Sequence, residues 1–133
     1  ALADYTKISG YARIYTAEEI KYWLYKEKIP VLIAIQTLTL NINSDNIIEV
    51  PETYPNFGHA LMVVGWNEKG FIIQNSWGTS WGKDGIAILP YDYKIREAWG
   101  ITINEISRRV AISKPKMLPA RKIIQNIINI FRR

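Results

Sequence analysis

The sequence predicts an α+β domain in which one leading helix packs on a curled antiparallel sheet. Three observations predict this fold class: an early helix-start pattern, a continuous run of β-branched apolar residues after it, and several shorter apolar runs separated by turn signals. One helix followed by a series of strands is the order expected of an α+β domain. The 133 residues, 48% apolar and 22% charged, are enough to bury one hydrophobic core.

The predicted helix starts at Thr16. Residues 16–19 read Thr-Ala-Glu-Glu, a capping-box pattern. In this pattern the Thr16 hydroxyl accepts a hydrogen bond from the Glu19 amide, and the Glu19 carboxylate reaches back to the backbone of Thr16. Apolar side chains then recur at helical spacing, at Ile20, Trp23 and Leu24. Because Pro30 ends the run, the pattern predicts a helix of about three turns.

A central strand is predicted directly after the helix. Residues 31–37, Val-Leu-Ile-Ala-Ile-Gln-Thr, are apolar on both faces and rich in β-branched side chains. That composition is typical of a strand covered on both sides. The following segment, residues 41–57, is polar and contains Asn, Asp and two prolines, so we expect a surface loop.

The chain then returns to strands. Residues 60–66 and 71–75 are apolar runs separated by the turn signal Asn-Glu-Lys-Gly at residues 67–70, which predicts a β-hairpin. Two shorter apolar runs predict further strands, at residues 86–89 and 99–104.

A basic tail follows the predicted domain of residues 1–104. Residues 105–133 contain eight Lys or Arg and one Glu, a net charge of +7, which leaves −2 on residues 1–104. Within the tail, residues 123–131 place isoleucines on one helical face and predict an amphipathic helix. This helix could bind to an anionic membrane surface, to an acidic groove on a partner protein, or to the body of its own chain. We favour docking on protein, because a membrane-binding helix would carry more lysine and more interfacial aromatic residues.

Composition narrows the function classes. Residues 1–104 have no excess of Lys and Arg that could bind along a phosphate backbone, so we expect no binding to nucleic acid. With no cysteine and one histidine, disulfides, thiolate zinc sites and histidine clusters are excluded, and no metal or organic cofactor is expected. No apolar run of about 18 residues occurs. A soluble protein or a component of an assembly is therefore favoured, and the sequence specifies no compartment.

The residues that could carry chemistry lie at the ends of the predicted hairpin. His59 precedes its first strand and Asn75 ends its second, so antiparallel pairing would place both at the same open end. There the Asn75 oxygen could accept a hydrogen bond from the imidazole, and Trp77 could shield that bond from water. From the residues alone, a lone histidine beside a strand is ordinarily structural, and Asn-Ser-Trp-Gly could equally be a turn that carries a packed tryptophan.

A resemblance favours the chemical interpretation. Residues 58–66, from Gly-His-Ala to Val-Gly-Trp, and residues 71–85, containing Asn-Ser-Trp-Gly-Thr-Ser-Trp-Gly, resemble the signature of papain-like cysteine peptidases. The similarity covers roughly residues 8–104. Residues 89–93 and 97–99 look like the bacterial and phage branch of the family.

The resemblance implies the right-hand lobe of such an enzyme, a curled half-barrel with one leading helix. It makes His59 the catalytic acid and base, Asn75 its orienting partner, and Trp77 the shield of their hydrogen bond. It also implies a left-hand lobe that carries a glutamine and the catalytic cysteine. No Gln-then-Cys motif occurs in this sequence.

Two functional hypotheses follow. In the first, the chain supplies His59 and Asn75 to a cysteine on a separate polypeptide or on another part of the same precursor, and the assembled site hydrolyses peptides. Alone it would be inactive, because losing the nucleophile of a catalytic triad costs on the order of 10⁶ in rate. In the second, the chain is an inactive structural or assembly module, for example of a virion or a surface complex.

Overall fold

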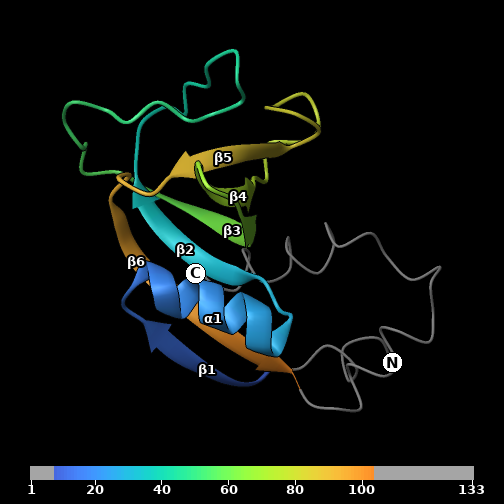
Figure 1. The fold of residues 1–133 in the computed structure, drawn as a ribbon. Helices are drawn as coiled ribbons and strands as arrows, with labels where there is room; N and C mark the ends of the chain where they lie inside the picture. The colour runs from blue at the N-terminus through green and yellow to red at the C-terminus, as the bar shows by residue number, and fades with distance from the viewer. Residues whose placement is uncertain (1–7, 104–133) are drawn as a thin grey trace.

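The computed structural model describes residues 8–103, which form a six-stranded antiparallel sheet and one helix (Figure 1). The elements in chain order are β1 (Ile8–Ile14), α1 (Ala17–Glu27), β2 (Val31–Gln36), β3 (Gly58–Trp66), β4 (Gly70–Gln74), β5 (Ile86–Pro90) and β6 (Ile95–Ile103). Their spatial order is β1-β6-β2-β3-β4-β5. The predicted α+β class with a curled antiparallel sheet is confirmed.

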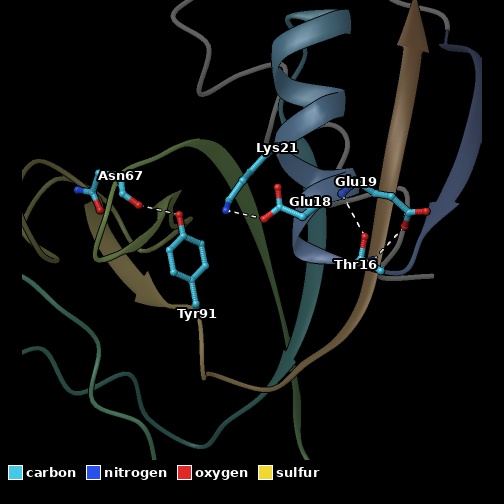
Figure 2. A network of polar contacts seen from close by, with 6 residues as sticks. All are labelled: Thr16, Glu18, Glu19, Lys21, Asn67 and Tyr91. Atoms are coloured by element: carbon cyan, nitrogen blue, oxygen red, sulfur yellow. Dashed lines mark hydrogen bonds and ion pairs between the residues drawn. The ribbon is translucent and has the colours of Figure 1, made fainter.

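The helix α1 starts where the sequence predicts. Figure 2 shows the capping box: the Glu19 amide donates to the Thr16 hydroxyl at 3.1 Å, and the Thr16 amide donates to the Glu19 carboxylate at 3.0 Å. The Tyr15 amide donates to the same carboxylate at 2.8 Å. The hydrogen bonds from these backbone amides stabilise the charged carboxylate and hold the pKa of Glu19 below its usual value. The bond from Tyr15 makes the largest contribution, followed by the bond from Thr16. After three turns, Lys28 adopts a left-handed conformation and ends the helix ahead of Pro30.

A second set of contacts joins α1 to the β4–β5 end of the sheet. Lys21 forms an ion pair with Glu18 at 2.8 Å and lies 4.6 Å from the centre of the Tyr91 ring. The Tyr91 hydroxyl donates to the carbonyl of Asn67 in the β3–β4 turn at 2.6 Å (Figure 2). Lys21 therefore connects α1 to Tyr91, the residue that follows β5, and Tyr91 in turn holds the β3–β4 turn.

The main core lies between α1 and one face of the sheet. Its fully buried side chains come from every strand between β2 and β5; those exposed by 1% or less are Val31, Ile33, Ile35, Ile48, Leu61, Val63, Phe71, Ile73, Ala87 and Leu89. A smaller cluster on the other face contains Leu32, Met62 and Ile101. Residues that alternate along β2 and β3 thus pack on opposite faces, as the pleat requires, and β2 is the predicted strand covered on both sides.

The structure differs from the prediction at three places. The helix is not the leading element, because β1 precedes it and pairs with β6 at the sheet edge. Strand β6 starts at Ile95, four residues before the predicted start. The predicted surface loop also contributes to the core: the Ile48 side chain is 1% exposed, and its amide donates to the carbonyl of Ile88 in β5 at 2.8 Å.

The predicted amphipathic helix of the tail lies outside the described residues, so the division into residues 1–104 and 105–133 stays a prediction. Between residues 8 and 103, α1 has 11 residues, and no helix there has the length and apolarity needed to cross a bilayer.

Candidate active site

The antiparallel pairing of β3 and β4 brings His59 and Asn75 together. His59 is the second residue of β3 and, by strand alternation, extends the buried row of Leu61 and Val63. Asn75 directly follows β4 and continues the row of Ile73. Both side chains therefore lie at the open end of the main core. Ile35 on β2 is the residue that pairs with His59 across the strands. The predicted proximity of the two side chains is met.

The two side chains share a hydrogen bond with a defined direction. The His59 Nε2 atom lies 2.9 Å from the Asn75 Oδ1 atom, and the Ser76 amide donates to the same oxygen at 2.7 Å. The backbone donor at Ser76 requires an oxygen at that position, which fixes the orientation of the Asn75 amide. Because this oxygen only accepts, the His59 proton sits on Nε2. In this tautomer Nδ1 is the ring nitrogen that does not carry the proton.

Asn75 is held firmly for a polar residue. Its side chain is 7% exposed, and its backbone amide donates to the carbonyl of Gly85 at 3.0 Å. Its Nδ2 group is buried and has no hydrogen-bond acceptor among the described residues. An unpaired buried donor costs about 1–3 kcal/mol, so an amide is a poor choice for stability at this position. The polar contacts of the Asn75 side chain are made by its oxygen, which binds the imidazole and the Ser76 amide.

Trp77 covers the histidine. The indole and imidazole ring centres are 4.8 Å apart with an interplanar angle of 33°, and the Trp77 side chain is 47% exposed. The indole therefore packs on the imidazole and is itself partly open to solvent, an arrangement that can limit the access of water to the ring. Trp81 meets Trp77 edge to face, at 5.9 Å and 87°, and also packs against the main core.

Glycines shape the loop between Asn75 and β5. Gly78, Gly82 and Gly85 have φ angles of 92°, 56° and 83°, a region that favours glycine. At Gly82 a side chain would also collide with the backbone, because a Cβ would lie 2.4 Å from the carbonyl oxygen of Ile86. Glycine at these positions therefore allows the tight loop between Asn75 and β5.

Sequence reasoning missed Asn46. It lies in the predicted surface loop, yet its Nδ2 donates to the Ile86 carbonyl at 3.0 Å and its Oδ1 accepts from the Lys83 amide at 3.1 Å. The Ser-Asp-Asn run at residues 44–46 indicates a turn, and Asn46 has a φ of 62°. Only the fold shows that this turn lies against the loop that follows Asn75.

The arrangement is suited to proton transfer. A single imidazole is held by an amide oxygen beneath an indole, which is the orienting half of a nucleophile–base–orienter triad. The chain contains no cysteine to serve as the nucleophile. In the part of the chain that the structure describes, no group of three or more His, Cys, Asp or Glu residues is arranged to bind a metal ion.

Comparison with known proteins identifies the same motif region. Residues 2–107 match the family model described as papain family cysteine protease. An uncharacterised peptidase C1-like protein of Acanthamoeba polyphaga mimivirus is 38% identical over 60 residues, 42% of this chain and 19% of that protein. Cysteine proteinase A of Leishmania mexicana is 29% identical over 84 residues (59% and 23%), and cathepsin K of Mus musculus is 50% identical over 51 residues (35% and 15%).

Solved structures show the same fold. Xylellain, a cysteine protease from Xylella fastidiosa, superposes with a TM-score of 0.59 and 25% identity, covering 74% of this chain and 41% of that one. The bromelain protease from Ananas comosus superposes with a TM-score of 0.53 and 20% identity, covering 73% and 51%. The chain thus spans about half or less of each protein that it matches. Because the relatives come from a virus, a bacterium, a protozoan, a plant and a mammal, assignment to a bacterial and phage branch stays a prediction.

Proposed function

Because the chain belongs to the papain family of cysteine proteases, we propose that it forms the right-hand lobe of a peptidase and supplies His59 and Asn75 to a cysteine outside these 133 residues. One observation carries the proposal: the 2.9 Å contact between His59 Nε2 and Asn75 Oδ1. It leaves Nδ1 as the atom that moves the proton. The Trp77 indole packs on the imidazole, which supports a role in limiting the access of water to this contact.

The proposed reaction has two stages. The cysteine thiol passes its proton to His59 Nδ1, and the thiolate attacks the carbonyl carbon of a peptide bond. As the C–N bond breaks, His59 returns the proton from Nδ1 to the leaving amine, which leaves a thioester. His59 then takes a proton from a water molecule that attacks the thioester, and the proton passes to the departing thiolate. Throughout, the Nε2 proton stays on the hydrogen bond to Asn75, which keeps the ring orientation constant.

A second polypeptide or a further segment would supply the left-hand lobe with its glutamine and cysteine. An apolar rim near His59, defined here as Leu38, Phe57 and Trp77, offers a contact surface for it. These side chains are 66%, 64% and 47% exposed, and the Thr37 amide donates to the Phe57 carbonyl beside the start of β3. Large apolar side chains exposed around a site are candidates for contact with a protein partner. Docking of the basic tail on protein, through residues 105–133, remains part of this proposal.

The experiment uses the absence of cysteine in this chain. The protein is purified from the cells that produce it, together with its bound partners, and treated with a thiol-reactive peptide probe. The label is expected on a polypeptide that is not the 15.4 kDa chain, or on a longer precursor that contains it, because this segment has no thiol. His59→Ala should abolish the label, since the thiol then loses its proton acceptor.

Two results would contradict the proposal. One is a complete lack of labelling in the native assembly. The other is labelling that His59→Ala leaves unchanged, because the reactive thiol would then not depend on this chain. Either result would favour an inactive structural or assembly module, in which His59 and Asn75 only hold the loop.

A further inference from the structure

The turn at residues 81–86 holds the backbone of Asn75 through the Gly85 carbonyl. Gly82, Asp84 and Gly85 all have positive φ angles, and Asp84 carries a side chain in that region. The Gly85 amide donates to the Trp81 carbonyl at 2.8 Å, and the Ile86 amide donates to the Lys83 carbonyl at 3.1 Å. Asp-Gly is a dipeptide that favours a two-residue turn with both φ angles positive, so residues 83–86 form a tight turn closed by backbone hydrogen bonds.

Asn46 supplies further contacts to this turn from another part of the chain. Its amide bridges Lys83 and Ile86, with Nδ2 on the Ile86 carbonyl and Oδ1 on the Lys83 amide. The Lys83 amide and the Ile86 carbonyl also bond to each other, at 2.9 Å, so Asn46 reinforces the closing pair of the turn. Gly82 leaves the space for this: a Cβ there would lie 3.2 Å from Asn46 Oδ1.

Asn46 is itself fixed by the framework. Its backbone amide donates to the Asn43 carbonyl at 3.0 Å, and its carbonyl accepts from the Ile88 amide in β5 at 2.9 Å. The left-handed φ of 62° is one that asparagine tolerates well. The side-chain amide is therefore directed at the turn by β5 and by its own loop.

Two routes lead from this turn to His59. The Gly85 carbonyl accepts the Asn75 amide at 3.0 Å, and Asn75 holds the imidazole. Trp81, at the other end of the turn, meets Trp77, which stacks on His59. A change in the turn would therefore reach both the orienting oxygen and the indole cover.

We infer that Asn46 is a positioning residue for His59, acting through the turn at residues 81–86 and through Asn75. The inference rests on the proposed function, since it concerns the same site. Asn46 touches neither the imidazole nor the scissile peptide in this scheme. Its effect is on the orientation and hydration of the His59 ring.

The test uses the full 133-residue chain and its single histidine, whose ring nitrogens can be followed by ¹⁵N NMR without overlap. The variant Asn46→Gly removes the amide but tolerates the positive φ, so it isolates the side-chain contribution. We expect the His59 Nε2 proton to exchange with water roughly two- to tenfold faster, the factor that one net hydrogen bond represents. The share of the Nε2-protonated tautomer should fall in the same sample. Asn46→Asp is a second variant: it keeps the acceptor for the Lys83 amide but sets a carboxylate oxygen against the Ile86 carbonyl, so we expect an effect in the same direction.

Asn43→Ala is the matched control. Asn43 also makes two side-chain bonds in this loop, accepting from the amides of Asp45 and Ile47 at 3.0 Å each, but it does not contact the turn. We expect it to change the His59 signals less than Asn46→Gly does, because the Asn46 side-chain bonds to the turn remain. Wild-type signals in both Asn46→Gly and Asn46→Asp would overturn the inference, and so would an equal shift in Asn43→Ala, which would indicate general loosening of the loop.

Asn75→Ala separates this inference from the proposed function. If Asn75→Ala changes the His59 signals and Asn46→Gly does not, the role of Asn46 fails while the proposed site stands. If Asn75→Ala also leaves His59 unchanged, the orienting pair itself is refuted.

Discussion

The indole of Trp23 lies directly on Gly100: a Cβ on that glycine would come within 2.4 Å of the Trp23 Cε2 atom. Trp23 belongs to α1 and Gly100 to β6, so this contact sets how closely the helix approaches the sheet. Trp23 also packs against the main core. The absence of a side chain at Gly100 is thus a condition for burying the apolar face of α1.

Gly100→Ala should destabilise the domain. The added methyl would force Trp23 and α1 away from β6, and overpacking of this kind costs about 1–3 kcal/mol. Urea unfolding followed by circular dichroism measures the effect. Gly58→Ala is the control, because a Cβ at Gly58 meets no atom within 4 Å, and its effect should stay within about 0.5 kcal/mol. Equal effects of the two variants would contradict the contact at Trp23.

Trp77→Ala should expose the His59–Asn75 hydrogen bond to water. We expect severalfold faster exchange of the His59 ring proton and weaker labelling of the partner cysteine, because the bond loses its dry surroundings. Trp66→Ala is the matched control: Trp66 is 39% exposed, close to the 47% of Trp77, but it lies at the far end of β3. Identical exchange rates in the two variants would argue against a shielding role.

Glu19 should make part of the domain's stability sensitive to acid. Hydrogen bonds from the backbone amides of Tyr15 and then Thr16 hold the pKa of Glu19 below its usual value, so the folded state favours the carboxylate. The stabilisation is present above the unfolded pKa and disappears as the pH falls through the folded pKa. Glu19→Gln keeps an acceptor for the cap but cannot ionise.

The measurement for Glu19 is the unfolding midpoint in urea at pH values from neutral to about pH 3, which spans the carboxyl range. The wild-type chain should lose stability more steeply toward acid than Glu19→Gln does. Parallel pH profiles for the two proteins would show that the capping carboxylate contributes no pH dependence.

Local signals in the sequence predicted the elements that depend on them. The Thr16–Glu19 capping box predicts where the helix begins, and the run of β-branched residues predicts the position of β2. Strand β1 escaped prediction because it is a mostly exposed edge strand interrupted by Gly10, without a clean alternation of apolar residues. Its partner β6 was shortened in the prediction because Arg96 and Glu97 break the apolar run.

The site divides in the same way. His59, Asn75 and Trp77 stand in recognisable motifs at the ends of a hairpin, so their proximity could be predicted from antiparallel pairing. The contacts of Asn46 could not be predicted, because its hydrogen bonds join residues about 40 positions apart in the sequence. No short-range pattern encodes such a contact. The burial of Ile48 likewise depends on its loop lying along β5.

The most direct test of the central claim is ¹⁵N NMR of the His59 imidazole in the wild-type chain, using the couplings between the ring protons and the two nitrogens. With Asn75 Oδ1 as the acceptor, the neutral ring should carry its proton on Nε2, leaving Nδ1 as the unprotonated nitrogen that the proposed reaction uses. Asn75→Ala should convert this into a mixture of tautomers. A wild-type ring protonated on Nδ1, or a mixture that Asn75→Ala does not alter, would contradict the account.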